Sequence, residues 1–536
     1  MSMNGCKAAA VSCKETLYTY NMFHMVKAFF PEAEIRQTVD EEQEPLVNLV
    51  LDGGSCFSVM PDLSVKTGAP DRAGGLPELE EDAAEQDVSC RAEGLRVQDV
   101  PCWMEELRKQ MQNSADQASL CVMSADRNER KKQVTRQIYD CLAAYTGKRL
   151  AWGTLTGVRP VKLAMNRLKT GDGEEEITAF LQREYQVSEE KARLAARIAE
   201  REMVLLDRLD YKNGFSLYIG IPFCPSICSY CSFSSSPIGL WKDRVEDYLE
   251  ALFREIRAIG ALTSGRQPDT VYIGGGTPVT LEAAQLDRLL SLVEDTFPEA
   301  VSGKGLLEYT VEAGRPDAIT REKLEVLRRQ EISRISVNPQ TMRQKTLDRI
   351  GRRHTVEDAV RSFWLARELG FDNINMDLIA GLPGETAADM QDTLQQIEAL
   401  CPDSLTVHSL AVKRAAQMGQ EKSEACNLEH REISRMIQDS GDAAKRMGMV
   451  PYYLYRQKNI AGNFENVGYA RADKAGIYNI LIMEEKQTIV ACGAGSVSKR
   501  VYPDGRIERS ENVKDVSQYI ERIGEMIERK RVLLED

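Results

Sequence analysis

Short apolar runs alternate with longer helical patterns over residues 215–411 of this 536-residue chain. The six runs are FSLYIG (215–220), TVYIG (270–274), LEYTVEA (307–313), ISRISVN (332–338), NINMDLI (373–379) and SLTVHSL (404–410). Such alternation predicts an α/β fold built on a parallel sheet. Right-handed crossovers would curl the six strands into a partial (β/α)6 barrel, with functional residues at the C-terminal strand ends.

The pattern changes on both sides of this stretch and predicts four regions in the chain. Residues 1–125 contain the strand-like run EPLVNLVLDG and predict a small α/β domain, and residues 126–206 have a helical pattern. Residues 207–411 form the predicted barrel. Residues 412–536 predict a mixed α+β region with a helix at 429–447, a terminal helix beginning near residue 513, and the strand-like runs PYYLYRQ (451–457), YNILIM (478–483) and TIVACG (488–493).

Charge and composition narrow the class of protein. The net charge is −13, whereas a general nucleic-acid-binding protein would carry a basic surface, so we expect no nucleic-acid partner. No apolar run approaches the ~20 residues that span a bilayer, and the N-terminus lacks the apolar core of a secretory signal. The 13 cysteines are therefore expected to be reduced thiols of a cytoplasmic protein.

Three of these cysteines are crowded directly after the first predicted strand, in IPFCPSICSYCSF (221–233). Cys224, Cys228 and Cys231 have C-x3-C-x2-C spacing, and no histidine lies close by in the sequence. A structural zinc ion takes four ligands, which leaves a catalytic zinc with three cysteines and water as the zinc alternative. A [4Fe-4S] cluster held by three cysteines leaves one iron open for a small molecule. The position at a barrel strand end favours the cluster.

C-x3-C-x2-C spacing after a first barrel strand resembles the radical S-adenosylmethionine (SAM) superfamily. The segment YIGIPFC (218–224) resembles the Y-x-H-I-P-F-C lead of the oxygen-independent coproporphyrinogen III oxidase group. The long N-terminal extension with WGTLTGVRP, together with RISVNPQTM, resembles the HemZ-type branch of that group. Gly220 stands where the group has a histidine, so a role given to that histidine does not carry over.

The resemblance implies two cofactors, a [4Fe-4S] cluster on the three cysteines and SAM on its open iron. Cleavage of SAM by the reduced cluster would yield a radical that abstracts a hydrogen from the substrate. The residues that occupy the group's cofactor-binding positions are Tyr218, Tyr230, Gly275, Gly276, Thr277, Glu312, Gln340, Arg352, Asp377 and Ala411. The glycines of GGGTP (274–278) would let the backbone approach the methionine part of SAM. Tyr230, Gly276 and Thr277 are implied for a second SAM molecule.

The activity implied is that of an oxygen-independent coproporphyrinogen III dehydrogenase of haem biosynthesis. This enzyme decarboxylates two propionates oxidatively to vinyl groups and consumes two SAM molecules per porphyrinogen. Members of this group have been assigned different activities, so a haem-binding chaperone and a radical SAM methyltransferase or haem-degrading enzyme remain alternatives. A structural iron–sulfur or zinc protein is the alternative outside this class.

Two kinds of partner follow from the resemblance: a tetrapyrrole substrate and a one-electron donor such as flavodoxin or ferredoxin. The four carboxylates of the substrate require cations in the pocket. The candidates are Arg315, Lys413, Arg414 and Arg456. A structural or solvated role is the alternative for each of them.

Overall fold

The computed structural model describes residues 6–31, 33–52, 54–68, 127–157, 159–211, 213–263, 265–301, 305–411, 430–456 and 464–535. The chain divides into two compact units. One contains Met1–Val158, Gly173–Arg193 and Gln457–Phe464, and the other contains Arg159–Asp172, Leu194–Arg456 and Glu465–Asp536. The four regions expected from the sequence are not the same division, and their boundaries stay a prediction.

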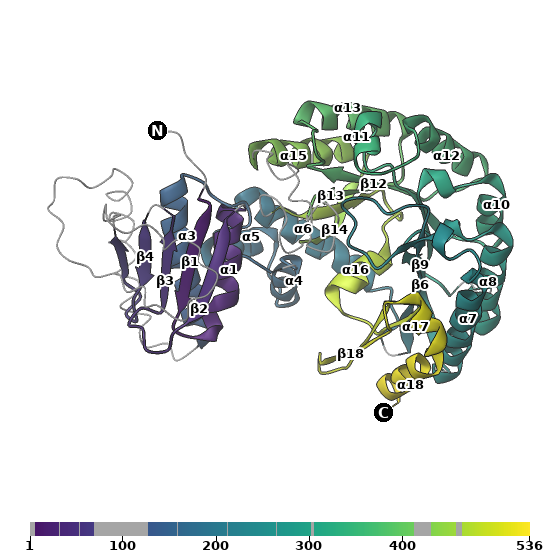
Figure 1. Cartoon of the computed structure of the whole chain (residues 1–536), viewed down its shortest axis with the longest axis horizontal. Coiled ribbons are helices and arrows are strands. Elements are labelled where there is room, and N and C mark those ends of the chain that lie inside the picture. Colours follow the sequence, from purple (N-terminus) through teal and green to yellow (C-terminus); the bar gives the residue numbers. More distant parts are fainter. Residues whose placement is uncertain are drawn as a thin grey trace. The chain divides into compact units, whose positions relative to one another are not determined.

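The first unit is built on a five-stranded sheet with the order β2-β1-β3-β4-β5 (Figure 1). Its strands are β1 (Ala8–Cys13), β2 (Glu34–Val39), β3 (Val47–Leu51), β4 (Cys56–Val59) and β5 (Val65–Gly68). Its helices are α1 (Thr16–Phe29), α3 (Arg127–Thr146) and α5 (Glu174–Tyr185). Met22 of α1 and Ile138 of α3 are buried in one core with Leu49 of β3. Helix α3, expected in the separate helical region, thus packs with the N-terminal sheet.

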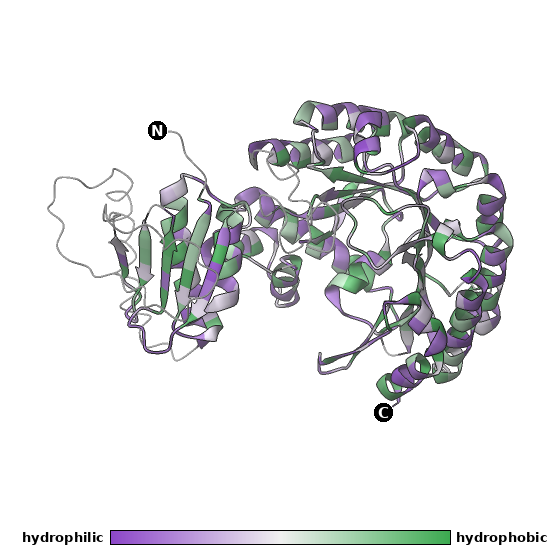
Figure 2. Cartoon of the chain, in the orientation of Figure 1, coloured by the Kyte–Doolittle hydropathy of each residue, from purple (hydrophilic) through white to green (hydrophobic). Residues whose placement is uncertain are grey.

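The second unit contains the predicted series of parallel strands. They are β6 (Gly214–Ile221), β9 (Gln267–Gly275), β10 (Glu308–Gly314), β11 (Arg334–Val337), β12 (Ile374–Ala380) and β13 (Ser404–Ser409). They lie side by side in chain order, and each pairs in parallel with the next. The prediction of six parallel strands is confirmed. Figure 2 shows that these strands are largely hydrophobic, as expected for a sheet covered on its outer face.

Helices cover the outside of this curved sheet (Figure 1). In chain order they are α7 (Val245–Leu262), α8 (Ala283–Thr296), α9 (Pro298–Val301), α10 (Arg321–Arg329), α11 (Gln344–Arg349), α12 (Val356–Glu368), α13 (Ala387–Leu400) and α15 (His430–Arg446). The short turns η1 (Ile238–Leu240), η2 (Pro278–Thr280) and η3 (Pro316–Ala318) follow strand ends. Two helices precede the barrel, α4 (Val161–Lys169) and α6 (Glu189–Leu206). No helix in the described part of the chain combines the length and apolarity that a membrane crossing requires.

The C-terminal part of the chain extends the sheet at both edges. Strands β14 (Val450–Tyr455) and β15 (Asn466–Ala470) join beside β13, and β16 (Ile489–Cys492), β17 (Val497–Val501) and β18 (Ile507–Glu511) join beside β6. Helices α17 (Val516–Glu521) and α18 (Ile523–Leu534) end the chain. The resulting eleven-stranded sheet has β14 and β18 at its edges, so the barrel is partial and open.

The expectation of a strand at YNILIM is wrong, because this segment lies in helix α16 (Ile477–Glu484). Its buried residues include Ile477, Ile480, Leu481 and Glu484, which recur at the three- to four-residue spacing of a helix face. A short apolar run has no polar positions to show its period, so its pattern cannot distinguish a strand from a buried helix.

A buried carboxylate joins the barrel to the C-terminal helices. Glu255 of α7 has no exposed surface and lies 2.5 Å from the Lys530 ammonium of α18. Tyr519 Oη, Asn512 Nδ2 and the Gly493 amide also donate hydrogen bonds to Glu255. Gly493 directly follows β16, so this network holds the C-terminal helices against the edge of the sheet that carries β6.

Replacing Lys530 by Met is expected to lower the free energy of unfolding of this unit by about 3–5 kcal/mol, because Glu255 would keep a buried charge without its counterion. Chemical denaturation followed by circular dichroism measures the change. The matched control is Arg531→Met, which removes an exposed partner of Glu528 on the same helix and should have little effect. Equal stability of the two variants would contradict the role of the buried pair.

Candidate active site

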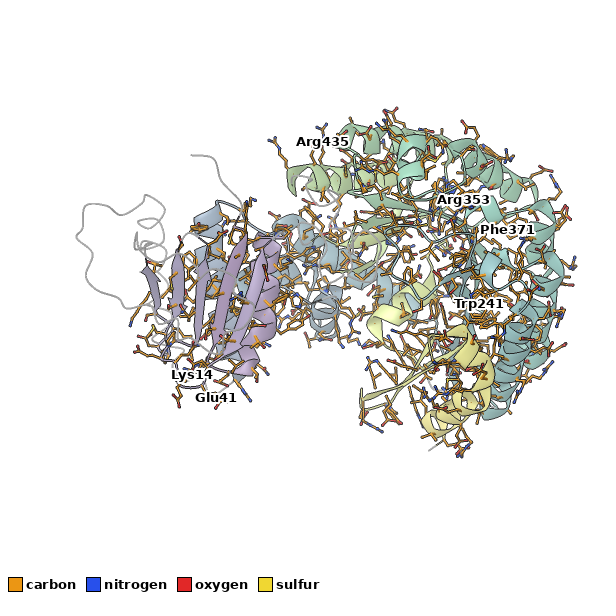
Figure 3. The ribbon with its side chains drawn as sticks, viewed as in Figure 1. Lys14, Glu41, Trp241, Arg353, Phe371 and Arg435 are labelled. Atoms are coloured by element: carbon orange, nitrogen blue, oxygen red, sulfur yellow. The ribbon has the colours of Figure 1, made fainter. Side chains whose placement is uncertain are left out.

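The cysteine loop, residues 222–236, connects β6 to the outer helix α7 at the C-terminal end of the barrel. A two-stranded parallel pair closes it, β7 (Phe223–Cys224) with β8 (Ser236–Pro237). Cys228 is buried, and Cys224 and Cys231 are half-buried. Figure 3 labels Trp241, which follows the loop just after η1. The loop therefore lies where the sequence places functional residues of such a barrel.

The three thiols are at least half-buried, and the charge of Cys228 acts on the other two. Burial raises the pKa of Cys224 and of Cys231, and each is raised further by the charge of Cys228. Among the described residues, no three His, Cys, Asp or Glu side chains gather closely enough to hold a single metal ion. The fit to a [4Fe-4S] cluster rests on the donor set, three thiols on one short loop, which is the set that leaves one iron of such a cluster open.

Glycines after β9 support the start of this loop. The amide of Gly276 donates to Ile221 O at 2.7 Å, and the amide of Thr277 donates to Phe223 O at 2.7 Å. A Cβ atom on Gly276 would lie 2.5 Å from Phe223 O, so a larger residue cannot fit without moving the backbone. Thr277 Oγ1 also lies 3.5 Å from Cys224 Sγ. The GGGTP segment thus positions the cysteines in addition to any contact with SAM.

Gly220, which replaces the histidine of the related group, lies against the neighbouring strand β16. A Cβ atom there would be 3.3 Å from Cys492 O. The Gly220 carbonyl accepts a 2.6 Å hydrogen bond from Tyr248 Oη of α7. A side chain at this position would require β16 to shift by a few tenths of an ångström.

Three stacked tyrosines lie near the candidate SAM residues. Tyr218 of β6 and Tyr272 of β9 have ring centroids 6.2 Å apart, and Tyr478 of α16 lies 4.5 Å from Tyr272 and 5.9 Å from Tyr218. Tyr272 Oη donates to Glu312 Oε1. Of the three rings, only Tyr218 was among the site residues that the sequence suggested. Tyr478 was missed because its segment was expected to be a strand.

Two carboxylates on β10 and β12, the strands on either side of β11, have pKa values shifted in opposite directions. The pKa of Glu312 on β10 is raised to about 7, first by burial and also by the charge of Asp377, against the lowering effect of the Tyr272 hydrogen bond. Burial also acts to raise the pKa of Asp377 on β12, but His408 and a 2.7 Å hydrogen bond from Asn375 lower it below its usual range. His408 Nε2 lies 3.7 Å from Asp377. His408 and Asn375 are site residues that the sequence analysis did not identify.

Gln340 and Arg352 follow β11 and carry polar atoms without partners. Gln340 has a left-handed backbone (φ 69°) and a buried Oε1 that accepts no hydrogen bond from any described residue. Arg352 donates to Asn338 O, and its Nε is buried and unpartnered among the described residues. Burial acts to lower the pKa of Arg352, but Tyr230 and Cys228 raise it above its usual range. Figure 3 labels the adjacent Arg353. Such orphaned donors and acceptors are expected where a polar ligand binds.

The remaining predicted residues fall into four groups. Ala411 is half-buried just after β13, where the described segment ends. Arg456 is buried directly after β14. Lys413 and Arg414 lie outside the described residues. Arg315 is buried and bonded to the cysteine loop, so its guanidinium is already engaged.

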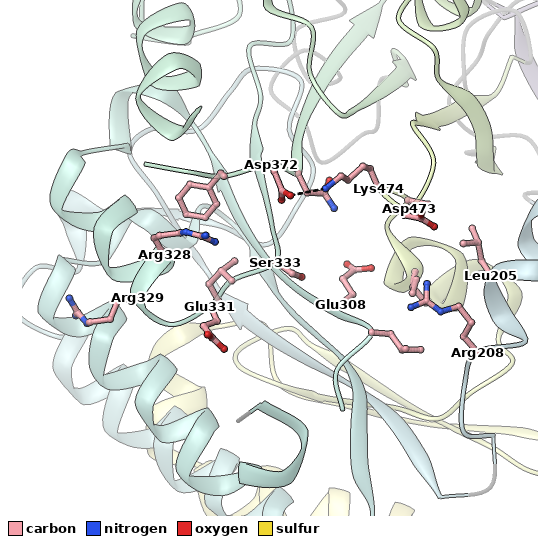
Figure 4. A pocket seen from close by; sticks show the side chains of 16 residues that line it. Leu205, Arg208, Glu308, Arg328, Arg329, Glu331, Ser333, Asp372, Asp473 and Lys474 are labelled. Atoms are coloured by element: carbon pink, nitrogen blue, oxygen red, sulfur yellow. Dashed lines mark ion pairs between the residues drawn. The ribbon is translucent and has the colours of Figure 1, made fainter. Parts of the chain in front are cut away.

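A cavity of about 530 Å³ lies at the opposite end of the barrel (Figure 4). It is lined by residues at the N-terminal ends of β10 and β11, including Glu308 and Ser333, and by the Lys474–Asp372 ion pair. Parallel strands place these residues away from the cysteine loop, which follows a C-terminal strand end. This cavity is therefore separate from the candidate active site.

The sequence matches the model of the radical SAM superfamily over residues 218–397. The oxygen-independent coproporphyrinogen-III oxidase-like protein HemZ of Bacillus subtilis is 43% identical over 409 residues, which cover 76% of this chain and 81% of HemZ. The chain belongs to the HemZ family of radical SAM proteins. Radical SAM proteins use a [4Fe-4S] cluster and SAM, so the prediction of both cofactors is confirmed.

Other relatives of this HemZ-family protein match over a shorter stretch. The heme chaperone HemW of Bacillus subtilis is 38% identical over 200 residues, or 37% of this chain and 51% of HemW. The oxygen-independent coproporphyrinogen III oxidase of Escherichia coli is 32% identical over 196 residues, or 37% of this chain and 42% of that protein. The solved structure of that oxidase, HemN, has a TM-score of 0.48 and 23% identity, covering 61% of this chain and 73% of HemN.

If Glu312 accepts hydrogen bonds from SAM, the affinity of this HemZ-family protein for SAM should rise about tenfold between pH 6 and pH 8. The reason is that the Glu312 carboxyl group ionises near pH 7, and the carboxylate is a stronger acceptor than the protonated acid. Anaerobic calorimetry with the cluster-loaded protein measures this affinity. Glu312→Gln should remove the pH dependence, whereas Glu331→Gln, at the opposite end of the barrel, should retain it. The same pH dependence in both variants would exclude Glu312.

Proposed function

We propose that this chain is an oxygen-independent coproporphyrinogen III dehydrogenase that converts two propionate side chains into vinyl groups. The observation that carries the proposal is the composition of the barrel's C-terminal end. A three-cysteine loop there leaves one iron of a cluster open, and the strand ends beside it contribute Glu312, Asp377 and the unpartnered atoms of Gln340 and Arg352. The identity with the oxidase-like HemZ over most of both chains supports the same substrate class.

We assign Cys224, Cys228 and Cys231 as the cluster ligands. When bound, the reduced cluster and SAM supply the one-electron chemistry that removes a hydrogen atom from a substrate carbon. The protein residues then have three tasks. Gln340, Arg352, Glu312 and Asp377 would bind and orient SAM, the glycine segment would hold the cysteine loop, and the barrel would exclude water.

The substrate must be held with a propionate β-carbon within about 3–3.5 Å of the reacting carbon before the hydrogen is transferred. Loss of that hydrogen atom, release of carbon dioxide and transfer of the one remaining electron to a one-electron acceptor leave a vinyl group. Propionates also require cationic partners. Among the described residues, we propose Arg456, buried directly after β14, for this contact.

A haem chaperone is the second candidate, and the 38% identity with HemW over 200 residues favours it. A chaperone would use the same barrel and bind haem without changing it. The two activities differ in the fate of the tetrapyrrole, so product analysis separates them.

The cysteine assignment predicts that the Cys224→Ala, Cys228→Ala and Cys231→Ala triple variant loses its cluster, because thiolates are the ligands that hold the irons. Iron and sulfide counting after anaerobic reconstitution, together with the visible spectrum, measures the loss. The control is Cys401→Ser, since Cys401 lies after α13, away from the cysteine loop, and its sulfur accepts a hydrogen bond from Arg471. It should keep the full cluster content. Full retention by the triple variant would contradict the assignment.

The substrate assignment predicts that the reconstituted protein, given SAM, a reductant and coproporphyrinogen III with deuterated propionate β-carbons, forms one 5′-deoxyadenosine and one carbon dioxide per vinyl group. The deuterium should appear in the 5′-deoxyadenosine, because the hydrogen is taken directly from the β-carbon. Mass spectrometry of the nucleoside and the tetrapyrrole measures both. Cleavage of SAM without deuterium uptake would overturn the substrate assignment. Tight haem binding with unchanged coproporphyrinogen would favour the chaperone.

A further inference from the structure

Arg315 connects the turn after β10 to the cysteine loop. Its side chain is 4% exposed, and its Nη1 donates to Ser226 O at 3.1 Å and to Cys228 Sγ at 3.5 Å. Its Nη2 donates to Ser226 Oγ at 3.1 Å. The Arg315 guanidinium is thus a buried cation that touches both the backbone of the loop and one of the assigned cluster sulfurs, and Arg352 is a second buried cation beside the same sulfur.

Asp317 compensates the charge of this arginine from the other side. Its carboxylate accepts a bidentate pair from Arg315, from Nε at 2.9 Å and from Nη2 at 2.7 Å. Burial acts to raise the pKa of Asp317, but Arg315 lowers it below its usual range. His354 Nδ1 lies 4.0 Å from Asp317. Burial lowers the pKa of His354 to about 4, so the imidazole is neutral and adds no charge to the pair.

A cation and a hydrogen bond at a cluster sulfur have a predictable electrostatic effect. Reduction adds one negative charge to the cluster, and hydrogen bonds and net charge around the sulfurs set its reduction potential. The interaction is strong here because water is excluded from the guanidinium. A positive group stabilises the reduced state and raises the potential, and a negative group next to it reduces this effect.

We propose that Arg315 tunes the reduction potential of the cluster through the Cys228 sulfur, and that Asp317 limits the size of that effect. Arg315 acts through the cluster ligand and is therefore a positioning and tuning residue. The proposal rests on the assignment of Cys228 as a ligand. As a consequence, replacing Arg315 and replacing Asp317 should shift the reduction potential of the cluster in opposite directions.

The experiment measures the midpoint potential of the reconstituted cluster, without SAM, by a reductive titration followed by electron paramagnetic resonance. Arg315→Gln should shift the oxidised-to-reduced ratio toward the oxidised state by about tenfold, which lowers the potential by about 59 mV for one electron. Asp317→Asn should raise the potential, because it leaves the guanidinium charge uncompensated. Arg315→Lys keeps the charge and should recover much of the loss.

The matched control is Arg321→Gln. Arg321 is an exposed arginine six residues further along the chain that pairs with Glu368 at 2.7 Å. The cluster of the Arg321→Gln variant should have the same midpoint potential as that of the unmodified protein, because solvent screens a surface charge. This control separates the local contact of Arg315 from a general change in net charge.

Equal potentials for Arg315→Gln, Asp317→Asn and the unmodified protein, at equal iron content, would overturn the proposal. A shift of both variants in the same direction would also overturn it, since that indicates a general disturbance of the loop. If Arg315→Gln fails to hold a cluster, the potentials of Arg315→Lys and Asp317→Asn are compared instead. A higher potential in Asp317→Asn supports the proposal, and equal potentials in the two variants overturn it. Iron content tests the cysteine assignment separately: a cluster kept by the triple cysteine variant refutes that assignment, whereas an unshifted potential refutes only the tuning role.

Discussion

The close packing of backbone around the end of β6 is the constraint on which the candidate site depends. Gly276 and Thr277 bond to the carbonyls of Ile221 and Phe223, and a Cβ atom on Gly493 would lie 2.3 Å from Gly220 O. The segment before Cys224 is therefore held from both neighbouring strands, β9 and β16. A loop that must present three thiols to one cluster needs such a rigid start, because its regular strand pairing is limited to the two residues of β7 with β8.

The surroundings of this loop combine charges of both signs in separate places. The cations Arg315 and Arg352 are buried beside Cys228, whereas the carboxylates Glu312 and Asp377 lie on β10 and β12. Neighbours decide the protonation of each acid: Glu312 is buried beside another carboxylate, and Asp377 has His408 and Asn375 as partners. Positive groups near the sulfurs and acceptors further along the rim suit a cofactor that chelates iron at one end and has hydroxyl groups at the other.

Membership of the HemZ family establishes the cofactors and the fold but leaves the reaction to the substrate pocket. Relatives named as oxidases and as heme chaperones each match about 200 residues of this chain. The match with HemZ extends over 409 residues, well beyond the shared barrel. The shared barrel therefore does not decide between an oxidase and a chaperone, and residues outside it belong to the question.

The sequence by itself determined the six parallel strands, their order and the position of the cysteine loop. These features are local, because strand and helix periods and a C-x3-C-x2-C spacing can be recognised within a few residues of each other. The tertiary structure decided the rest. The YNILIM segment is a helix whose Ile480 and Leu481 pack in one core with Tyr452. His408 of β13 and Asn375 of β12 contact Asp377, and Arg315 contacts Cys228 across 87 positions of the chain. Such contacts depend on which strand ends the barrel brings together, and no short-range pattern in the sequence encodes that.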